Sequence, residues 1–271
     1  MNQNKLETVL IGTDPEVFVV NRQTRQVLSA IGLIPGTKDR PFDISDTGHA
    51  IQTDNVMAEF CVPPSNNPSK LYADIRQCID FINGLLPAHA ECNVQASAFL
   101  DPLFLRNRQA KTFGCDPDFN VYSLSQNDAP KSNTNLRTAG GHIHIGYENP
   151  DQKTNMKIIQ AMDLFLGIPS ILLDKDTERR KMYGKAGCFR EKSYGVEYRT
   201  LSNFWIASEE LVNWAFTQSM RAVKFAFEED WLVDEVQVDI QLAINKQDLD
   251  LACKIAKQFN ITMSQEQYIT V

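Results

Sequence analysis

Two histidines separated by a single residue stand out in a chain that contains four. They lie in the segment TAGGHIHIGYE, residues 138–148, next to β-branched isoleucines. Successive side chains of a strand point to opposite faces, so His142 and His144 share one face while Ile143 and Ile145 share the other. The pattern predicts a strand with one apolar face and one polar face.

Charged residues follow the same spacing in two other segments. Asp14 and Glu16 flank a proline in GTDPEVF, and the proline favours extended geometry before it, so both carboxylates are expected on one side of a strand. Glu197 and Arg199 alternate in GVEYRTL, and Glu59 lies among apolar residues in DNVMAEFCV. Lone charges in such strands are costly to bury, so we expect these carboxylates to converge.

Converging carboxylates need a proton or a cation. Two carboxylates about 4 Å apart repel each other by roughly 4 kcal/mol at an effective dielectric constant of 20. Oxygen ligands with a single imidazole and no thiolate favour Mg²⁺, or Mn²⁺, over structural zinc. The sequence therefore predicts a magnesium site, while charged residues on a solvated sheet face stay open as the alternative for each pair taken alone.

A basic segment precedes the strand that contains Glu197. Residues 174–192, DKDTERRKMYGKAGCFREK, contain seven basic residues within an acidic protein. This concentration next to a metal strand favours a phosphate-binding segment, and a solvated loop is the alternative. Arg199 would point into the same cavity. The sequence has no GxxxxGK[ST] and no helix-opening GxGxxG, so a nucleotide would be held through metal and arginine.

Composition excludes several classes of protein. The net charge of -7 and the pI near 5.2 argue against a nucleic-acid or membrane-surface binder, which needs a basic field. The amino end shows no signal pattern, and no apolar run approaches the roughly 18 residues of a membrane span, so we expect a cytoplasmic protein. The six cysteines form no CxxC pair, which indicates reduced structural thiols.

Strands and helices are expected in irregular order, without a linker between domains. Apolar and β-branched runs predict strands, and 3.6-residue periodicity predicts helices. The expected strands cover residues 8–20, 51–62, 93–100 and 194–204 besides the histidine segment, and the expected helices cover residues 67–86, 151–168, 208–226 and 249–259. Residues 101–137 are polar and irregular. The pattern predicts an α+β fold with a largely antiparallel sheet.

The motifs GTDPEVF, DNVMAEFCVPP, GGHIHIG and RRKMYGKAGCFREKSYGVEYRTLSNFW occur in an order that resembles the glutamine synthetase-like carboxylate-amine ligases. The resemblance is greatest to the phage-encoded type 2 branch, covers about residues 10–205, and extends to the glutamate-cysteine ligases. It implies one catalytic domain, residues 1–271, with a curved, mostly antiparallel half-barrel sheet, helices on its outer face, and a helical part over 206–271.

The resemblance also implies roles for individual residues. The implied ligands of Mg²⁺ are Asp14, Glu16, Glu59, His142 and Glu197; the implied contacts to ATP are His144, Arg180, Arg190, Lys192 and Arg199, and the three arginines are the implied catalytic residues. Asp14 stands where the ligases often have glutamate. The chain begins almost at the first metal strand, so we expect it to lack the small amino-terminal domain of glutamine synthetase.

The expected reaction is ATP-dependent formation of an amide from a carboxylate and an amine through an acyl phosphate. The partners would be small molecules or peptides, in the host cytoplasm if the gene is carried by a phage. Asp116 and Asp118, in GCDPDFNVY, could bind the amine or simply form a turn. Two alternatives remain: a hydrolase or oxygenase that uses the His-x-His pair to bind its metal, and a non-catalytic binding or structural module of a phage.

Overall fold

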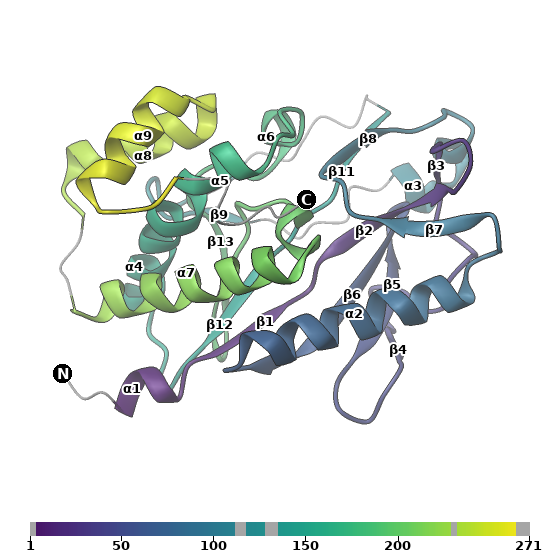
Figure 1. Ribbon diagram of the computed structural model, residues 1–271, viewed down its shortest axis with the longest axis horizontal. Helices are drawn as coiled ribbons and strands as arrows, with labels where there is room; N and C mark the ends of the chain where they lie inside the picture. The colour runs from purple at the N-terminus through teal and green to yellow at the C-terminus, as the bar shows by residue number, and fades with distance from the viewer. Residues whose placement is uncertain (1–3, 112–117, 128–134, 229–231, 264–271) are drawn as a thin grey trace.

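The computed structural model describes residues 4–111, 118–127, 135–228 and 232–263 (Figure 1). Its described part contains a twelve-stranded sheet whose named strands pair in antiparallel fashion. The strands are β1 (Leu10–Thr13), β2 (Glu16–Asn21), β3 (Val27–Leu28), β4 (Phe42–Asp43), β5 (Ala50–Asp54), β6 (Met57–Ser65), β7 (Ala90–Asn93), β9 (Phe119–Asn120), β10 (Ser125–Gln126), β12 (Ile143–Gly146), β13 (Cys188–Lys192) and β14 (Gly195–Tyr198). The expected α+β class with a large antiparallel sheet is confirmed.

The main path of the sheet runs β10-β9-β13-β14-β12-β1-β6-β2-β3, and the sheet is open at both ends of this path. β5 joins it through β6, β4 through β5, and β7 through β2. A separate pair is formed by β8 (Ser97–Phe99) and β11 (Leu136–Thr138). The three strands β12, β1 and β6 lie at the centre, so the segments with the histidines and with the first carboxylates are neighbours.

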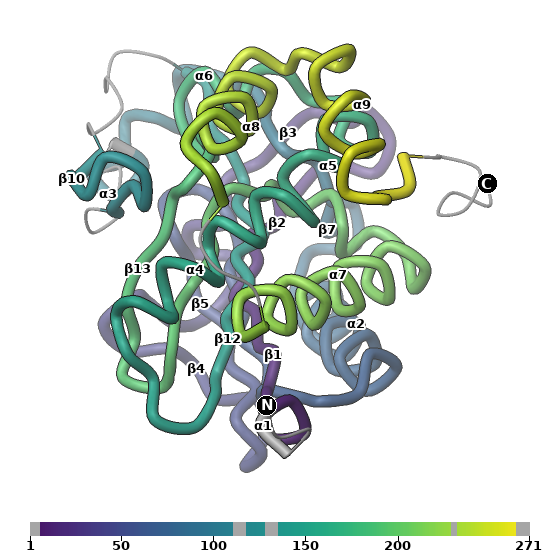
Figure 2. Tube along the Cα trace, turned by 90° about the vertical axis from the view of Figure 1, so that its left-hand side faces the viewer, coloured from purple at the N-terminus to yellow at the C-terminus, as the bar shows by residue number. Residues whose placement is uncertain are grey.

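Helices cover one face of the sheet. Figure 2 shows α7 and α2 on one side of the central strands. α2 packs against β6, α4 packs against α7 and β14, and α8 packs against α9. The helices are α1 (Asn4–Glu7), α2 (Pro68–Leu85), α3 (Arg108–Lys111), α4 (Gln152–Met162), α5 (Ile168–Leu173), α6 (Arg179–Met182), α7 (Glu209–Glu228), α8 (Asp234–Lys246) and α9 (Leu249–Gln258), with 3₁₀ turns η1 (Phe104–Arg106) and η3 (Asn203–Ile206) and a π-helical turn η2 (Asp163–Gly167).

Local chemistry explains several boundaries that the sequence predicted. Asn67 caps α2 by accepting a hydrogen bond from the Lys70 N–H, and a proline occupies the first helical position, where no N–H is needed. Asp151 caps α4 in the same way through the Thr154 N–H. The break between β1 and β2 falls at Asp14 and Pro15, as the turn-like residues there predicted.

Two predicted elements are wrong in extent. The single strand expected over 51–62 is the hairpin β5–β6, which turns at Asn55 with a φ of 53°, a left-handed conformation that asparagine tolerates. The strand expected over 194–204 is shorter, because β14 ends at Tyr198 and the turn η3 begins at Asn203. The last residues of the basic segment form β13 and pair with β14. Helix α8 was not predicted. The exposed Val238 and Leu242 alternate with Val236 and Ile240 at the two-residue spacing of a strand, which hides the buried helical stripe that includes Ile240 and Ile244.

The continuous helix Gln152–Leu173 is long and apolar enough to be the one candidate membrane span in the described part of the chain. The expectation that no segment approaches the length of a membrane span is therefore wrong. However, 78% of its most apolar 18-residue window is buried inside the fold. The segment therefore packs as a core helix.

A buried carboxylate lies beneath the strand β14. Asp163, in the π-helical turn, is 0% exposed and accepts hydrogen bonds from the hydroxyls of Tyr198 at 2.7 Å, Thr200 at 3.2 Å and Tyr122 at 3.0 Å. Burial raises the pKa of Asp163 to about 6, although these hydrogen bonds oppose the shift. This network ties β14 to the helical layer on the face opposite the acidic residues.

Asp163→Asn is expected to change how stability depends on pH. The folded pKa of about 6 exceeds the ordinary pKa of 3.8 of an aspartate in an unfolded chain, so the folded state binds the proton more tightly than the unfolded state. The wild-type free energy of unfolding should therefore fall by roughly 3 kcal/mol through this group as pH rises from about 4 to about 6. The unfolded carboxyl is already mostly ionised at pH 4.5, so urea unfolding at pH 4.5 and pH 7.5 should show about 2 kcal/mol of this loss in the wild type and none of it in Asp163→Asn. Equal losses in the two proteins would contradict the assignment.

Candidate functional site

The register of the sheet brings the predicted acidic residues and histidines together on one face. Glu16 on β2 lies directly opposite Glu59 on β6. On the other side of the centre, His144 on β12 lies opposite Glu197 on β14, which in turn lies opposite Arg190 on β13. Residues opposite each other in adjacent strands have neighbouring side chains, so two acidic clusters flank the break between β1 and β2.

Asp14 lies at that break and contacts both histidines. Its Oδ1 is 3.2 Å from Nδ1 of His142 and 3.1 Å from Nε2 of His144. Burial raises the pKa of Asp14, but the interactions with His144 and His142 outweigh burial and hold this pKa well below its usual value. Asp14 is therefore an anion that the two imidazoles stabilise. Nδ1 of His144 is also 2.5 Å from the hydroxyl of Tyr194.

Glu197 is the most enclosed acidic residue of this face, with 0% exposure. The Glu197 carboxylate accepts a hydrogen bond from Arg199. Its Oε2 lies 2.8 Å from Nζ of Lys192, and its Oε1 lies 3.9 Å from Nη1 of Arg190. Burial acts to raise the pKa of Glu197, but His142 and Arg199 lower it to about 2. The basic segment thus supplies two cations to the carboxylate that follows it, whereas the sequence analysis expected these cations to bind phosphate.

Glu16 and Glu59 lie in the opposite electrostatic environment. Burial and the charge of Asp54 raise the pKa of Glu16 to about 8, although the Gly140 N–H donates to its Oε2 at 2.6 Å. Burial, then Asp14 and Glu16, raise the pKa of Glu59, and Gln52 donates to Glu59 at 2.6 Å. This pair of facing carboxylates has too little positive charge around it, which is the condition that a divalent cation relieves.

The donor set fits a hard divalent cation. One ligand atom each from Asp14, His144 and Glu197 lies within 4.8 Å of the others, and this trio is the described group that could hold an ion. His144, rather than His142, is the imidazole of that trio. Nδ1 of His142 lies 3.3 Å from Nη1 of Arg199. Burial, and to a smaller extent the charge of Arg199, lowers the pKa of His142. Carboxylate oxygens with one imidazole suit Mg²⁺ or Mn²⁺.

Two glycines before the histidine strand leave room for this arrangement. A Cβ added to Gly140 would lie 2.5 Å from Nε2 of His142, and one added to Gly141 would lie 2.4 Å from the Ser202 carbonyl. The Gly140 N–H and C=O contact Glu16, through its carboxylate and its backbone N–H. A side chain at position 140 would displace His142, and one at position 141 would displace the backbone at Ser202.

A small cavity next to the acidic residues is lined by Arg179, a member of the basic segment for which the sequence analysis predicted no role of its own. Arg179 and Arg199 line it together with Glu16, His142 and Asp118. Arg179 is 4% exposed and donates to the backbone carbonyls of Thr200 and Arg199. The missing signal was helical geometry: α6 begins at Arg179, so adjacent arginines point in different directions.

The neighbouring Arg180 does not line this cavity, in contrast to the role predicted for it. Its guanidinium donates to Oγ of Ser170 at 2.6 Å, in the helical layer, and Asp174 and Asp163 are among the charges around it. Asp118, by contrast, lies at the site, with Oδ2 3.6 Å from Nε of Arg199. Asp116 lies outside the described residues.

Arg180→Met is expected to lower stability without weakening nucleotide binding. The change removes a buried charge-assisted hydrogen bond to Ser170, which is worth about 1.5–3 kcal/mol. Urea unfolding measures the loss, and ATP titration by calorimetry tests the affinity. If a folded Arg180→Met protein binds ATP more than tenfold more weakly, Arg180 does contribute to the nucleotide site.

Residues 132–238 match the family model described as Phage phiEco32-like COOH.NH2 ligase-type 2. This part of the chain resembles the type 2 carboxylate-amine ligases. The ligase-like segment contains both histidines, the basic segment, Glu197 and Arg199, whereas Asp14, Glu16 and Glu59 precede it.

The fold has a solved counterpart. Over 95% of its length, the chain is similar to the crystal structure of a bifunctional glutathione synthetase from Pasteurella multocida, with a TM-score of 0.51 and 11% sequence identity. At this identity the similarity concerns the fold, and the ligase-like chain spans 48% of that protein's length. The chain has no match among curated proteins.

Proposed function

We propose that this protein is an ATP-dependent carboxylate-amine ligase that forms an amide bond. The observation that carries the proposal is the trio Asp14, His144 and Glu197, within 4.8 Å, next to the cations Lys192 and Arg199. Oxygen-rich metal ligands flanked by basic side chains suit a metal-nucleotide complex. The match to the ligase family model supports this chemistry over other uses of the same groups.

The proposed ligands of Mg²⁺, or Mn²⁺, form two groups. Asp14, His144 and Glu197 would hold one ion, and the facing pair Glu16 and Glu59 would hold another. When bound, the ions would neutralise charge on the triphosphate. His142 touches Asp14 and Arg199, and is proposed to orient those two side chains.

The protein's own residues would manage the phosphoryl group. We assign Arg199, with Arg190 and Lys192 beside it, to the oxygens of the transferred group, because these cations gather at Glu197. Arg179 and Asp118 line the adjoining cavity and are proposed to contact the substrates. One oxygen of the substrate carboxylate would attack the γ-phosphorus and ADP would leave; the amine nitrogen would then attack the acyl carbon, releasing phosphate and a proton.

The proposal also covers the domain organisation, the location and the partners of the protein. We propose that residues 1–271 form one catalytic domain acting in the cytoplasm on small-molecule or peptide substrates. Its net charge of -7 supports partners other than nucleic acid or anionic membrane surfaces.

The test is a scan of acid and amine pairs with Mg²⁺ and ATP, read as ADP release and followed by mass spectrometry of the product. ADP and phosphate that form only when both acid and amine are present are expected. AMP and pyrophosphate would contradict the acyl-phosphate step. Tightly bound zinc or iron with indifference to ATP would favour a hydrolase or oxygenase instead, and no turnover with any pair would favour a binding module.

A further inference from the structure

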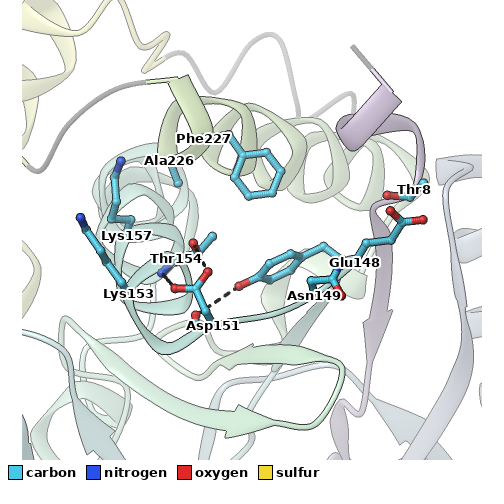
Figure 3. A pocket seen from close by; sticks show the side chains of 10 residues that line it. Thr8, Glu148, Asn149, Asp151, Lys153, Thr154, Lys157, Ala226 and Phe227 are labelled. Carbon is cyan, nitrogen blue, oxygen red and sulfur yellow. Dashed lines mark hydrogen bonds between the residues drawn. The ribbon is translucent and has the colours of Figure 1, made fainter. Parts of the chain in front are cut away.

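A second cavity lies where the histidine strand runs into the helical layer. It has a volume of about 320 Å³ and is formed by the turn after β12, the first two turns of α4, and the last turn of α7. Its volume is at the lower end of the range for small-molecule sites. None of the acidic or basic residues assigned above lines this cavity (Figure 3).

The wall of the cavity is aromatic. The rings of Tyr147 and Phe227 meet edge to face, with centroids 5.7 Å apart, and Ala226 lies beside them. The Tyr147 hydroxyl donates to Oδ1 of Asn155 at 2.7 Å, which fixes the ring. Such a wall favours an apolar or aromatic group of a ligand.

Opposite charges lie on the two sides of this wall. Figure 3 shows Lys153 and Lys157 on one side of the cavity and Glu148 on the other. Asp151 also lines the cavity, but its carboxylate already accepts from the N–H and the hydroxyl of Thr154, at 3.0 Å and 2.6 Å. The lysine side therefore suits an anionic group of a ligand.

The helix ends reinforce the same polarity. The lysines belong to the first two turns of α4, the positive end of its dipole, whereas Phe227 belongs to the last turn of the 20-residue α7, the negative end. A ligand with a carboxylate towards α4 and an ammonium group towards Glu148 and α7 would match both ends.

We propose that this cavity binds a small zwitterion, an amino acid with an apolar or aromatic side chain. The carboxylate would contact Lys153 and Lys157, the ammonium group would contact Glu148, and the side chain would lie against Tyr147 and Phe227. This proposal does not depend on the proposed ligase activity, because it uses none of the residues assigned to metal or phosphate.

The experiment is a calorimetric titration of the full chain with the twenty standard amino acids, together with two truncated probes. L-phenylalanine is expected to bind, and 3-phenylpropionate, which lacks the ammonium group, and phenethylamine, which lacks the carboxylate, should each bind at least about tenfold more weakly, a loss of about 1.4 kcal/mol. Binding by none of the amino acids, or equal binding of the truncated probes, would overturn the proposal.

Variants locate the site. The double change Lys153→Ala with Lys157→Ala, and Glu148→Gln, should each weaken phenylalanine binding at least tenfold, while Lys254→Ala with Lys257→Ala, exposed on α9, should not. Circular dichroism checks that each variant is folded. Glu197→Gln should retain phenylalanine binding; if it abolishes binding, the amino acid occupies the acidic site and the proposal fails.

Discussion

Glu197→Gln is expected to lower the affinity for Mn²⁺ at least about a hundredfold and to reduce ADP release at least about a thousandfold. Glu197 is the fully buried anion to which His142, Arg199 and Lys192 converge. Glutamine keeps the size of the side chain but removes the negative charge that Arg199, Lys192 and the ion share. Electron paramagnetic resonance of Mn²⁺ measures the affinity, and the substrate pair found by the scan measures the rate.

A matched control for this change lies on β13, directly between the cations Arg190 and Lys192. Glu191 is an exposed glutamate on β13 that contacts none of the proposed ligands, so Glu191→Gln should leave both quantities within about twofold. The metal-site assignment fails if a folded Glu197→Gln protein binds Mn²⁺ as the wild type does.

Arg199→Met is expected to separate metal binding from phosphoryl transfer. Arg199 touches Glu197 and lies 3.6 Å from Asp118, so its removal takes a cation away from two carboxylates. Mn²⁺ affinity should therefore hold or rise, while ADP release falls about a thousandfold, the scale on which an arginine stabilises phosphoryl transfer. The same two assays measure this split.

The control for Arg199 is an arginine far from the acidic face. Arg76 on α2 is paired with Asp80 at 3.1 Å, so Arg76→Met should change neither assay. A parallel loss of Mn²⁺ affinity and ADP release in a folded Arg199→Met protein would mean that the arginine organises the metal site instead of the transferred group.

Spacing and residue type predicted the composition of the candidate site well. Two-residue alternation fixes which side chains share a face, so Glu197 with Arg199 could be placed without knowing any strand partner. The register that puts Glu16 opposite Glu59, and His144 opposite Glu197, depends on long-range pairing and could only be supposed.

The sequence predicted side-chain directions and element boundaries less well where these depend on a turn or a short helix. Arg179 and Arg180 are adjacent and chemically identical, and only the start of α6 decides that Arg179 lines the small cavity beside Glu16. The hairpin within residues 51–62 was missed because Asn55 breaks an apolar run without a glycine or a proline. Helix α8 was missed because the exposed Val238 and Leu242 give its apolar residues the two-residue spacing of a strand.

The long strand β6 pairs with both β1 and β2, on either side of the break at Pro15. The hydrogen bonds of β6 therefore link the strand segments on both sides of Asp14 to the pair Glu16 and Glu59, so we expect these strands to open together. Amide hydrogens of these strands, such as those of Ile11 and Phe60, should exchange with deuterium at one common, slow rate set by global unfolding. Such a sheet would keep the proposed metal ligands Asp14, Glu16 and Glu59 in fixed positions even when the outer helices fray.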